Sequence, residues 1–168
     1  VTPLYKGLLE KFPDIAPTDW KFEVPIGSTT ISGGLHTLSP EPNLTIYFVD
    51  HREFFWRNGL YTERGYDYPD NFVRFLFFSQ CVVHLAQHLD WQPEVVHGHD
   101  WPTGLVSALM RHRWETGTWA NPARTCFTIH NLVIGLQTHP VRCQIEVSGG
   151  MQRRGSLLHS STHERSGI

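Results

Sequence analysis

Pro93-Glu94-Val95-Val96-His97-Gly98-His99-Asp100-Trp101 is the most informative stretch of the sequence, and Phe127-Thr128-Ile129-His130-Asn131 repeats its pattern. Each is a short apolar run, rich in β-branched residues, that ends in histidine beside aspartate or asparagine. This pattern is typical of a buried parallel strand that delivers polar side chains at its carboxyl end. In open α/β sheets, ligands bind outside these carboxyl ends. We therefore expect the two strand ends to form one site.

The order of strand and helix patterns indicates an α/β protein. Apolar runs at residues 44–49, 95–97 and 125–129 predict strands, and helical patterns follow Pro69 and Trp101. Strands and helices that alternate with short connections form parallel sheets with right-handed crossovers. The sequence therefore predicts a partial Rossmann-like parallel sheet.

The longest helix is expected to begin at Pro69, with Asp67 as its N-cap. Its apolar positions recur at intervals of three and four residues and predict one buried stripe, which consists of Phe72, Phe75, Leu76, Val82, Val83, Ala86 and Leu89. Arg74 lies off this stripe, so we expect it at the surface or beside the cap. Earlier in the chain, residues 21–26 predict an edge strand, and residues 29–38 predict a second strand with a bulge or bend at its Gly-Gly pair.

The composition is that of one globular domain or a part of a larger one. The chain has 168 residues, of which 40% are hydrophobic, and a formal net charge of −2. This charge gives no long-range attraction to nucleic acid or to an anionic membrane, and no apolar run approaches the roughly 20 residues that cross a bilayer. Nucleic acid and membrane are therefore not expected as partners. Cys81 and Cys126 lie in apolar runs and are expected to be core thiols.

The last part of the chain differs from the rest. No aromatic residue follows Phe127, and residues 133–168 are rich in Ser, Gly, Arg and His. A flexible tail explains this composition. A frameshifted or mis-spliced segment that begins just after Asn131 explains it too, and we favour that reading. Because the chain opens at Val1, we expect a processed N-terminus or a fragment.

The side chains at the two strand ends suit sugar hydroxyls. Alternate residues of a strand share a face, so His97 and His99 should point the same way. Asp100 falls close to the N-cap of the next helix, where it acts either as a plain cap or as an oriented, ionised carboxylate at the lip of a cleft. The imidazole of His130 and the amide of Asn131 both donate and accept hydrogen bonds, which suits a neutral polyhydroxyl ligand better than a phosphate.

A metal site is the main alternative for the same residues. His97, His99 and Asp100 could begin the ligand set of a metal-dependent hydrolase. Such a site needs further ligands at later strand ends, where only His130 and Asn131 are candidates. The sequence contains neither a Gly-x-Ser-x-Gly elbow nor a glycine-rich phosphate loop, so it indicates no serine nucleophile and no nucleotide site of that kind.

Four blocks of the chain resemble the N-terminal domain of bacterial glycogen synthases and plant starch synthases. The blocks are Tyr47-Phe48-Val49-Asp50-His51 with Phe54-Phe55-Trp56-Arg57 and Gly59-Leu60-Tyr61; Asp70-Asn71-Phe72-Val73-Arg74-Phe75; Trp91 to Trp101; and Phe127-Thr128-Ile129-His130-Asn131-Leu132. The resemblance implies the GT-B fold, in which two Rossmann-like domains face each other across a cleft. It also implies transfer of glucose from ADP-glucose to an α-1,4-glucan with retention, without a metal or other cofactor.

The resemblance also implies roles for residues. Asp100 is expected to support the acceptor or the reacting sugar, and His130 to contact the transferred glucose near its 6-hydroxyl, with Asn131 beside it. His97 and His99 are expected to bind substrate or to support these residues. The intact enzyme would work in a bacterial cytoplasm or a plastid stroma.

The chain also departs from the family pattern. The family opens with a first strand and a Lys-x-Gly-Gly loop, which this chain lacks, and after Leu132 the family motif gives way to Val133-Ile134-Gly135. We therefore expect an incomplete synthase domain over residues 1–132 and a non-homologous tail over residues 133–168. A chain of this kind is expected to be inactive alone, and a non-catalytic remnant stays open as a further alternative.

Overall fold

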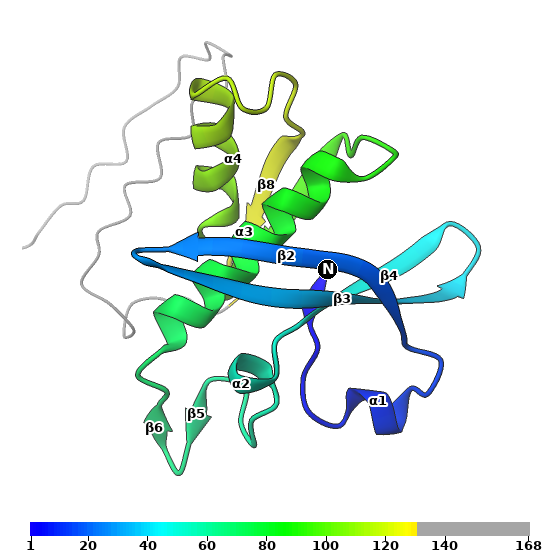
Figure 1. The fold of residues 1–168 in the computed structure, drawn as a ribbon, viewed down its shortest axis with the longest axis vertical. Coiled ribbons are helices and arrows are strands. Elements are labelled where there is room, and N and C mark those ends of the chain that lie inside the picture. The colour runs from blue at the N-terminus through cyan, green and yellow to red at the C-terminus, as the bar shows by residue number, and fades with distance from the viewer. Residues whose placement is uncertain (131–168) are drawn as a thin grey trace, which may run out of the picture.

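The computed structural model describes residues 1–130, which form a mixed α/β fold, as expected from the sequence (Figure 1). Within this range no helix is long and apolar enough to span a membrane. Residues 131–168, which include Asn131, the expected boundary at Leu132 and the tail, lie outside the described residues. The division into domains therefore stays a prediction. In chain order the elements are β1 (Thr2–Pro3), α1 (Leu8–Lys11), β2 (Ala16–Ile26), β3 (Thr29–Glu41), β4 (Leu44–Asp50), α2 (Arg52–Phe55), β5 (Thr62–Glu63), β6 (Tyr66–Asp67), α3 (Asn71–His88), β7 (Val95–His99), the 3₁₀ turn η1 (Trp101–Thr103), α4 (Val106–Glu115) and β8 (Arg124–Thr128).

The described strands form two main sheets instead of one. One sheet has the order β1-β4-β3-β2, and β7 pairs with β8 in a separate sheet. The β7–β8 pair is parallel, as expected, and so is the β1–β4 pair, whose strand β1 was not predicted. Strands β2, β3 and β4 pair antiparallel. Two-residue connections join β2 to β3, at Gly27 and Ser28, and β3 to β4, at residues 42–43, and turns this short cannot carry the crossover that a parallel pair needs. As predicted, residues 21–26 lie in an edge strand, β2.

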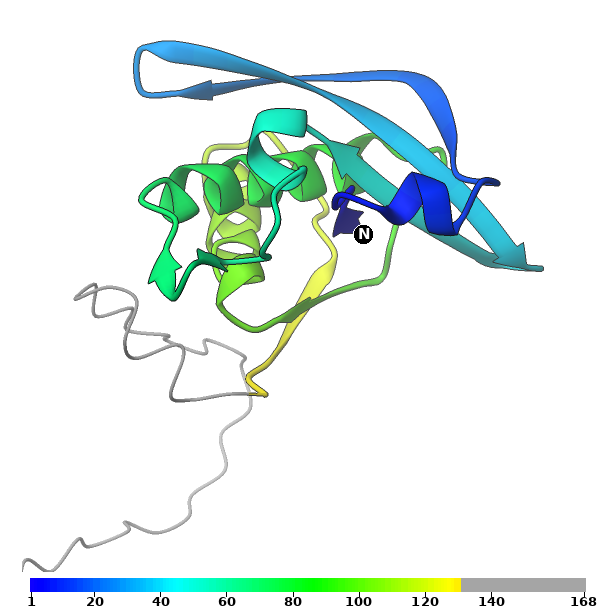
Figure 2. The same cartoon turned by 90° about the horizontal axis from the view of Figure 1, so that it is seen from below.

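Helix α3 is the centre of the main core. Figure 2 shows the long β2–β3 hairpin as a layer over α3, with α4 and β8 on the other side of that helix. Because α3 has neighbours on both sides, it buries more than the single predicted stripe. Phe75, Val82, Val83 and Ala86 are buried as predicted, and the buried set also includes Phe77, Phe78, Cys81 and Leu85. The prediction for Phe72 is wrong, since its side chain is 51% exposed.

The start of α3 differs from the prediction in two ways. The helix begins at Asn71 with Asp70, not Asp67, at the N-cap position, and Asp70 makes no side-chain capping hydrogen bond. Its carboxylate instead accepts a hydrogen bond from Arg57, with 2.7 Å between Nη1 and Oδ1. Arg74 was expected at the surface or beside the cap, but its side chain is 0% exposed. Both errors arise because the segment between α2 and α3 folds back over the first turns of the helix.

The cysteine prediction holds for one of the two described residues. Cys81 is fully buried in α3, whereas Cys126 is exposed on β8. The prediction for Cys126 is wrong because residues 124–126 of β8 are all exposed in the described part of the chain.

Gly33 of β3 lies close to Phe77 of α3. A Cβ atom at Gly33 would lie 2.7 Å from Cζ of Phe77 and 3.0 Å from the carbonyl oxygen of Asp50, both too close for a methyl group. At Gly34 the nearest atom would be Cβ of Asp50 at 3.9 Å, which is an ordinary contact. The expected irregularity lies beside this pair, where the register shifts between Pro17 and Lys21 of the facing strand.

We predict that Gly33→Ala destabilises the protein and that Gly34→Ala does not. The added methyl group at Gly33 must displace the Phe77 ring or the strand, and such overpacking costs about 1–3 kcal/mol. Gly34→Ala has room for its methyl group and lowers the entropy of the unfolded chain, so it should be neutral or slightly stabilising. Urea unfolding of both variants and the wild type measures the difference. Equal stabilities of the two variants would contradict the packing described here.

Candidate functional site

The parallel pairing of β7 and β8 brings the two polar strand ends together, as the sequence predicted. In the register, His97 faces Cys126 and His99 faces Thr128. A backbone hydrogen bond of 2.9 Å from Arg124 to Glu94 closes the amino end of the pair, and one of 2.9 Å from Asp100 to Thr128 closes the carboxyl end. His130 follows two residues after β8 and therefore lies at the same edge as Asp100.

Three imidazoles form a row along this edge. The rings of His97 and His99 lie 4.1 Å apart between centroids, which confirms that they share a face of the strand. Nδ1 of His99 lies 3.1 Å from Nε2 of His130, and these two rings are stacked at 5.3 Å. Nε2 of His97 lies 2.8 Å from Oγ1 of Thr128. All three histidines are exposed, so their remaining nitrogen atoms can reach a ligand in solution.

The His99–His130 contact needs one proton between two nitrogen atoms. A neutral imidazole has one donor and one acceptor, whereas a protonated imidazole has two donors. The pair can therefore hold its hydrogen bond when at least one ring is neutral, and the bond is lost when both rings are protonated. A row of neutral imidazoles offers donors and acceptors to hydroxyl groups.

Asp100 connects the two strand ends through its side chain. Its Oδ1 atom accepts a hydrogen bond of 2.6 Å from the backbone N–H of His130. The residue makes no side-chain capping bond to η1, so the plain helix cap considered from the sequence is not formed. Asp100 has the backbone angles φ 54° and ψ −179°. This combination lies outside the left-handed helical region, in a region that is essentially restricted to glycine, so the backbone is strained at Asp100.

The turn after β7 is packed tightly around Gly98 and Thr103. Gly98 is buried, and a Cβ atom there would lie 2.9 Å from Oγ1 of Thr103 and 3.1 Å from the ring of Phe127. The hydroxyl of Thr103 donates to the carbonyl oxygens of His99, at 2.9 Å, and of Asp100, at 3.2 Å. The absence of a side chain at Gly98 therefore lets Thr103 and Phe127 approach closely, next to the backbone that carries Asp100.

An aromatic wall stands next to the polar edge. The ring of Trp101, which directly follows Asp100, packs at 4.7 Å from Phe75 and at 5.1 Å from Tyr61. Burial raises the pKa of the Tyr61 hydroxyl, and the negative charge of Asp100 raises it further. Sequence reasoning gave no site role to Tyr61, Thr103 or Thr128. Their contribution depends on contacts across the fold, although Tyr61 and Thr128 do lie in the blocks that carry the family resemblance.

A hollow lies elsewhere on the protein, at the carboxyl end of β4, where Asp50 and His51 form another polar pair. Its lining consists of Thr30, Ile31, Ser32, Asp50, His51, Arg52 and Glu53. The His51 ring stacks on Phe54 at 4.1 Å, and burial lowers the pKa of its imidazole. His51 is therefore neutral near pH 7. This hollow is separate from the His97–His130 edge.

The metal-dependent alternative gains no support from this geometry. Within residues 1–130 there is no group of three or more His, Cys, Asp or Glu side chains placed to hold a metal ion. Instead, His97 contacts the Thr128 hydroxyl, His99 contacts the His130 ring, and Asp100 accepts from the backbone N–H of His130. The expected partner Asn131 lies outside the described residues.

Comparison with known proteins gives a consistent match over this part of the chain. The family model described as starch synthase catalytic domain matches residues 1–151. A glycogen synthase of Opitutus terrae is 36% identical over 131 residues, which cover 77% of this chain and 27% of the relative. Glycogen synthase 2 of Geobacter sulfurreducens is 33% identical over 132 residues, which cover 79% of this chain and 27% of the relative. The chain thus spans about a quarter of the length of these curated relatives.

We predict that Asp100→Ala loosens the link between the strand ends more than Asp100→Asn does. Asparagine keeps an acceptor oxygen for the His130 amide, whereas alanine loses it, and the backbone strain at φ 54° and ψ −179° is common to both variants. Loss of a hydrogen bond to a charged acceptor should speed amide exchange at His130 by about tenfold or more in the alanine variant. Hydrogen exchange followed by NMR measures this rate. If both variants exchange at the wild-type rate, the Asp100–His130 contact does not hold this edge together.

Proposed function

This chain belongs to the family of starch synthase catalytic domains, and from that premise we propose that it forms one wall of the active site of a glucosyltransferase. In this proposal the donor is a nucleotide-activated glucose, ADP-glucose, and the acceptor is an α-1,4-glucan of the glycogen or starch type. The observation that carries the proposal is the meeting of Asp100, His99 and His130 at the carboxyl edge of β7 and β8.

The chemistry of the edge suits a sugar that gains positive charge as it reacts. Glucosyl transfer passes through a state in which the anomeric carbon carries positive charge, and a fixed carboxylate stabilises such charge without reorganising. Asp100 is held in one position by its bond to the His130 amide and by the Thr103 turn. We assign it to the reacting sugar or to the acceptor hydroxyl, in a reaction that retains the anomeric configuration.

The imidazoles provide hydrogen bonds to sugar hydroxyls. We assign His130 to the transferred glucose, near its 6-hydroxyl, with Asn131 beside it. His99 holds the His130 ring through the 3.1 Å contact between their nitrogen atoms, and His97 is in turn held by Thr128. Imidazole and carboxylate groups bind hydroxyls well, whereas a diphosphate calls for Arg or Lys. We therefore expect the diphosphate of the donor to be bound away from this row of histidines.

In this proposal, the residues of this wall bind no metal ion or other cofactor. The partners of the enzyme are the sugar nucleotide and the glucan. We place the enzyme in a bacterial cytoplasm or a plastid stroma. The bacterial location is supported by the relatives described above, which are bacterial glycogen synthases.

A chimaera tests the proposed function most sharply. In this chimaera, residues 1–130 of the present chain replace the matching segment of the Opitutus terrae relative. We predict that the chimaera transfers labelled glucose from ADP-glucose to glycogen. Asp100→Ala and His130→Ala should each lower kcat in this chimaera by about two to three orders of magnitude, as for loss of an electrostatic group that acts in the transition state.

Two controls accompany this assay. Thermal unfolding shows that each variant is folded, and the 168-residue chain alone should give no transfer. A folded chimaera without activity, or variants with near-wild-type kcat, would contradict the proposed function or the assignment of these two residues, respectively.

A further inference from the structure

A fully buried arginine lies below the aromatic wall. Arg74, in the first turns of α3, has a side chain that is 0% exposed. Burial of a guanidinium group is costly unless hydrogen bonds compensate for the lost water. Burial is the main cause that lowers the pKa of Arg74, and the nearby positive charge of Arg57 lowers it further. An apolar residue would fill this position at less cost, so the charge at this place calls for an explanation.

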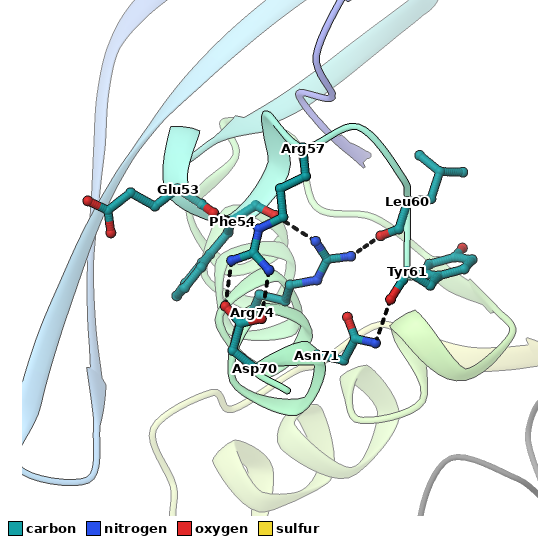
Figure 3. A network of polar contacts seen from close by, with 8 residues as sticks. All are labelled: Glu53, Phe54, Arg57, Leu60, Tyr61, Asp70, Asn71 and Arg74. Carbon is teal, nitrogen blue, oxygen red and sulfur yellow. Dashed lines mark hydrogen bonds and ion pairs between the residues drawn. The ribbon is translucent and has the colours of Figure 1, made fainter. Parts of the chain in front are cut away.

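The guanidinium of Arg74 holds two backbone carbonyl groups of one segment. Nη1 donates to the carbonyl oxygen of Phe54 at 2.6 Å, and Nη2 donates to the carbonyl oxygen of Leu60 (Figure 3). Phe54 is in α2, and Leu60 lies just before β5. One side chain therefore fixes both ends of the connection between them. The guanidinium also lies over the ring of Phe75, 4.5 Å from its centroid.

A second arginine fastens the same connection to the start of α3. Arg57 binds the carboxylate of Asp70 through two hydrogen bonds of 2.7 and 2.5 Å, and its Nε donates to the carbonyl oxygen of Glu53 at 2.8 Å. Figure 3 shows both arginines side by side between the connection and the helix. The hydrogen bonds from Arg57 lower the pKa of Asp70, so this carboxylate is ionised at neutral pH. The connection is thus held by the helix at several points.

The connection ends on the residue that packs against the candidate site. Leu60 is followed by Tyr61, whose carbonyl oxygen accepts from the side chain of Asn71 at 3.0 Å and from the backbone of Tyr68 at 3.0 Å. The Tyr61 ring then packs 5.1 Å from Trp101, the residue after Asp100. A chain of direct contacts therefore runs from the Arg74 guanidinium to the backbone of Asp100.

We propose that Arg74 is a positioning residue for the site: by holding Leu60 it sets the Tyr61 ring against Trp101, and so fixes Asp100 in the geometry that binds the His130 amide. This inference rests on the proposed function for the meaning of the site, but its structural content does not depend on it. A guanidinium suits the task because its rigid fork can donate to two carbonyl groups at once, whereas an ammonium group is a compact point charge. Arg74 itself touches no expected substrate group.

A matched pair of arginine variants separates positioning from general stability. Arg113 is also partly buried, with Nη1 donating to Oε1 of Gln87 at 2.5 Å, and it joins α4 to the far end of α3. Arg74→Met and Arg113→Met each remove one guanidinium and one charge from a contact of α3. The readouts, in the full 168-residue chain, are amide exchange at His130, the Trp101 indole resonance, and the pH titrations of His99 and His130 by NMR.

We predict that Arg74→Met speeds amide exchange at His130 by about tenfold relative to Arg113→Met, as for loss of a charged hydrogen bond. It should also shift the Trp101 resonance and the titration of His130, whereas Arg113→Met should leave all three at wild-type values. The lysine of Arg74→Lys can bind only one carbonyl group well, so its rate of amide exchange at His130 should lie between those of wild type and Arg74→Met. If Arg74→Met does not fold, the comparison is made with Arg74→Lys.

Two results would overturn the proposal: equal changes in the Arg74 and Arg113 variants, or wild-type values in a folded Arg74 variant. All of these readouts are taken without a ligand. The chimaera assay decides the proposed function separately, so a failure of one inference does not hide a failure of the other.

Discussion

The parallel register between β7 and β8 determines where every side chain of the candidate site lies. Because successive residues of a strand point to opposite faces, a slip of one residue would move the histidines away from their partners. The register is held at one end by the Arg124–Glu94 backbone hydrogen bond and at the other by the Asp100–Thr128 bond. The carboxylate of Asp100 then reaches His130 and closes the edge.

Helix α3 links this edge to the rest of the fold. One side of the helix packs under the β2–β3 hairpin, where Gly33 allows Phe77 to approach the sheet. Its first turns bind the connection between α2 and β5 through the buried Arg74 and through Asp70. The aromatic rings of Phe75 and Trp101 join these contacts to the polar edge. The packing of the core and the geometry of the candidate site therefore both depend on α3, and a change in its first turns is expected to affect both.

The sequence predicted the parts of this arrangement that depend on local pattern. Strands β7 and β8 follow from their apolar, β-branched runs, and the shared face of His97 and His99 follows from alternation along a strand. The meeting of both strand ends follows from the order of the elements. The burial expected of these two strands is wrong, since Val95 is 55% exposed and residues 124–126 are exposed. The partner of Asp100 could not be found in this way, because the bond to His130 spans 30 residues and depends on the register. Arg74 was misjudged because its partners are backbone carbonyl groups, which leave no trace in a sequence pattern.

In the function we propose, the edge formed by His99, Asp100 and His130 contacts the sugar directly. The most direct test is NMR of the isotope-labelled 168-residue chain with maltoheptaose, in which intermolecular nuclear Overhauser effects identify the protons that touch the glucan. The proposed function predicts such effects between sugar protons and the ring protons of His99 and His130. Saturable binding of maltoheptaose whose Overhauser contacts all lie elsewhere, for example at the His51 hollow, would contradict the claim.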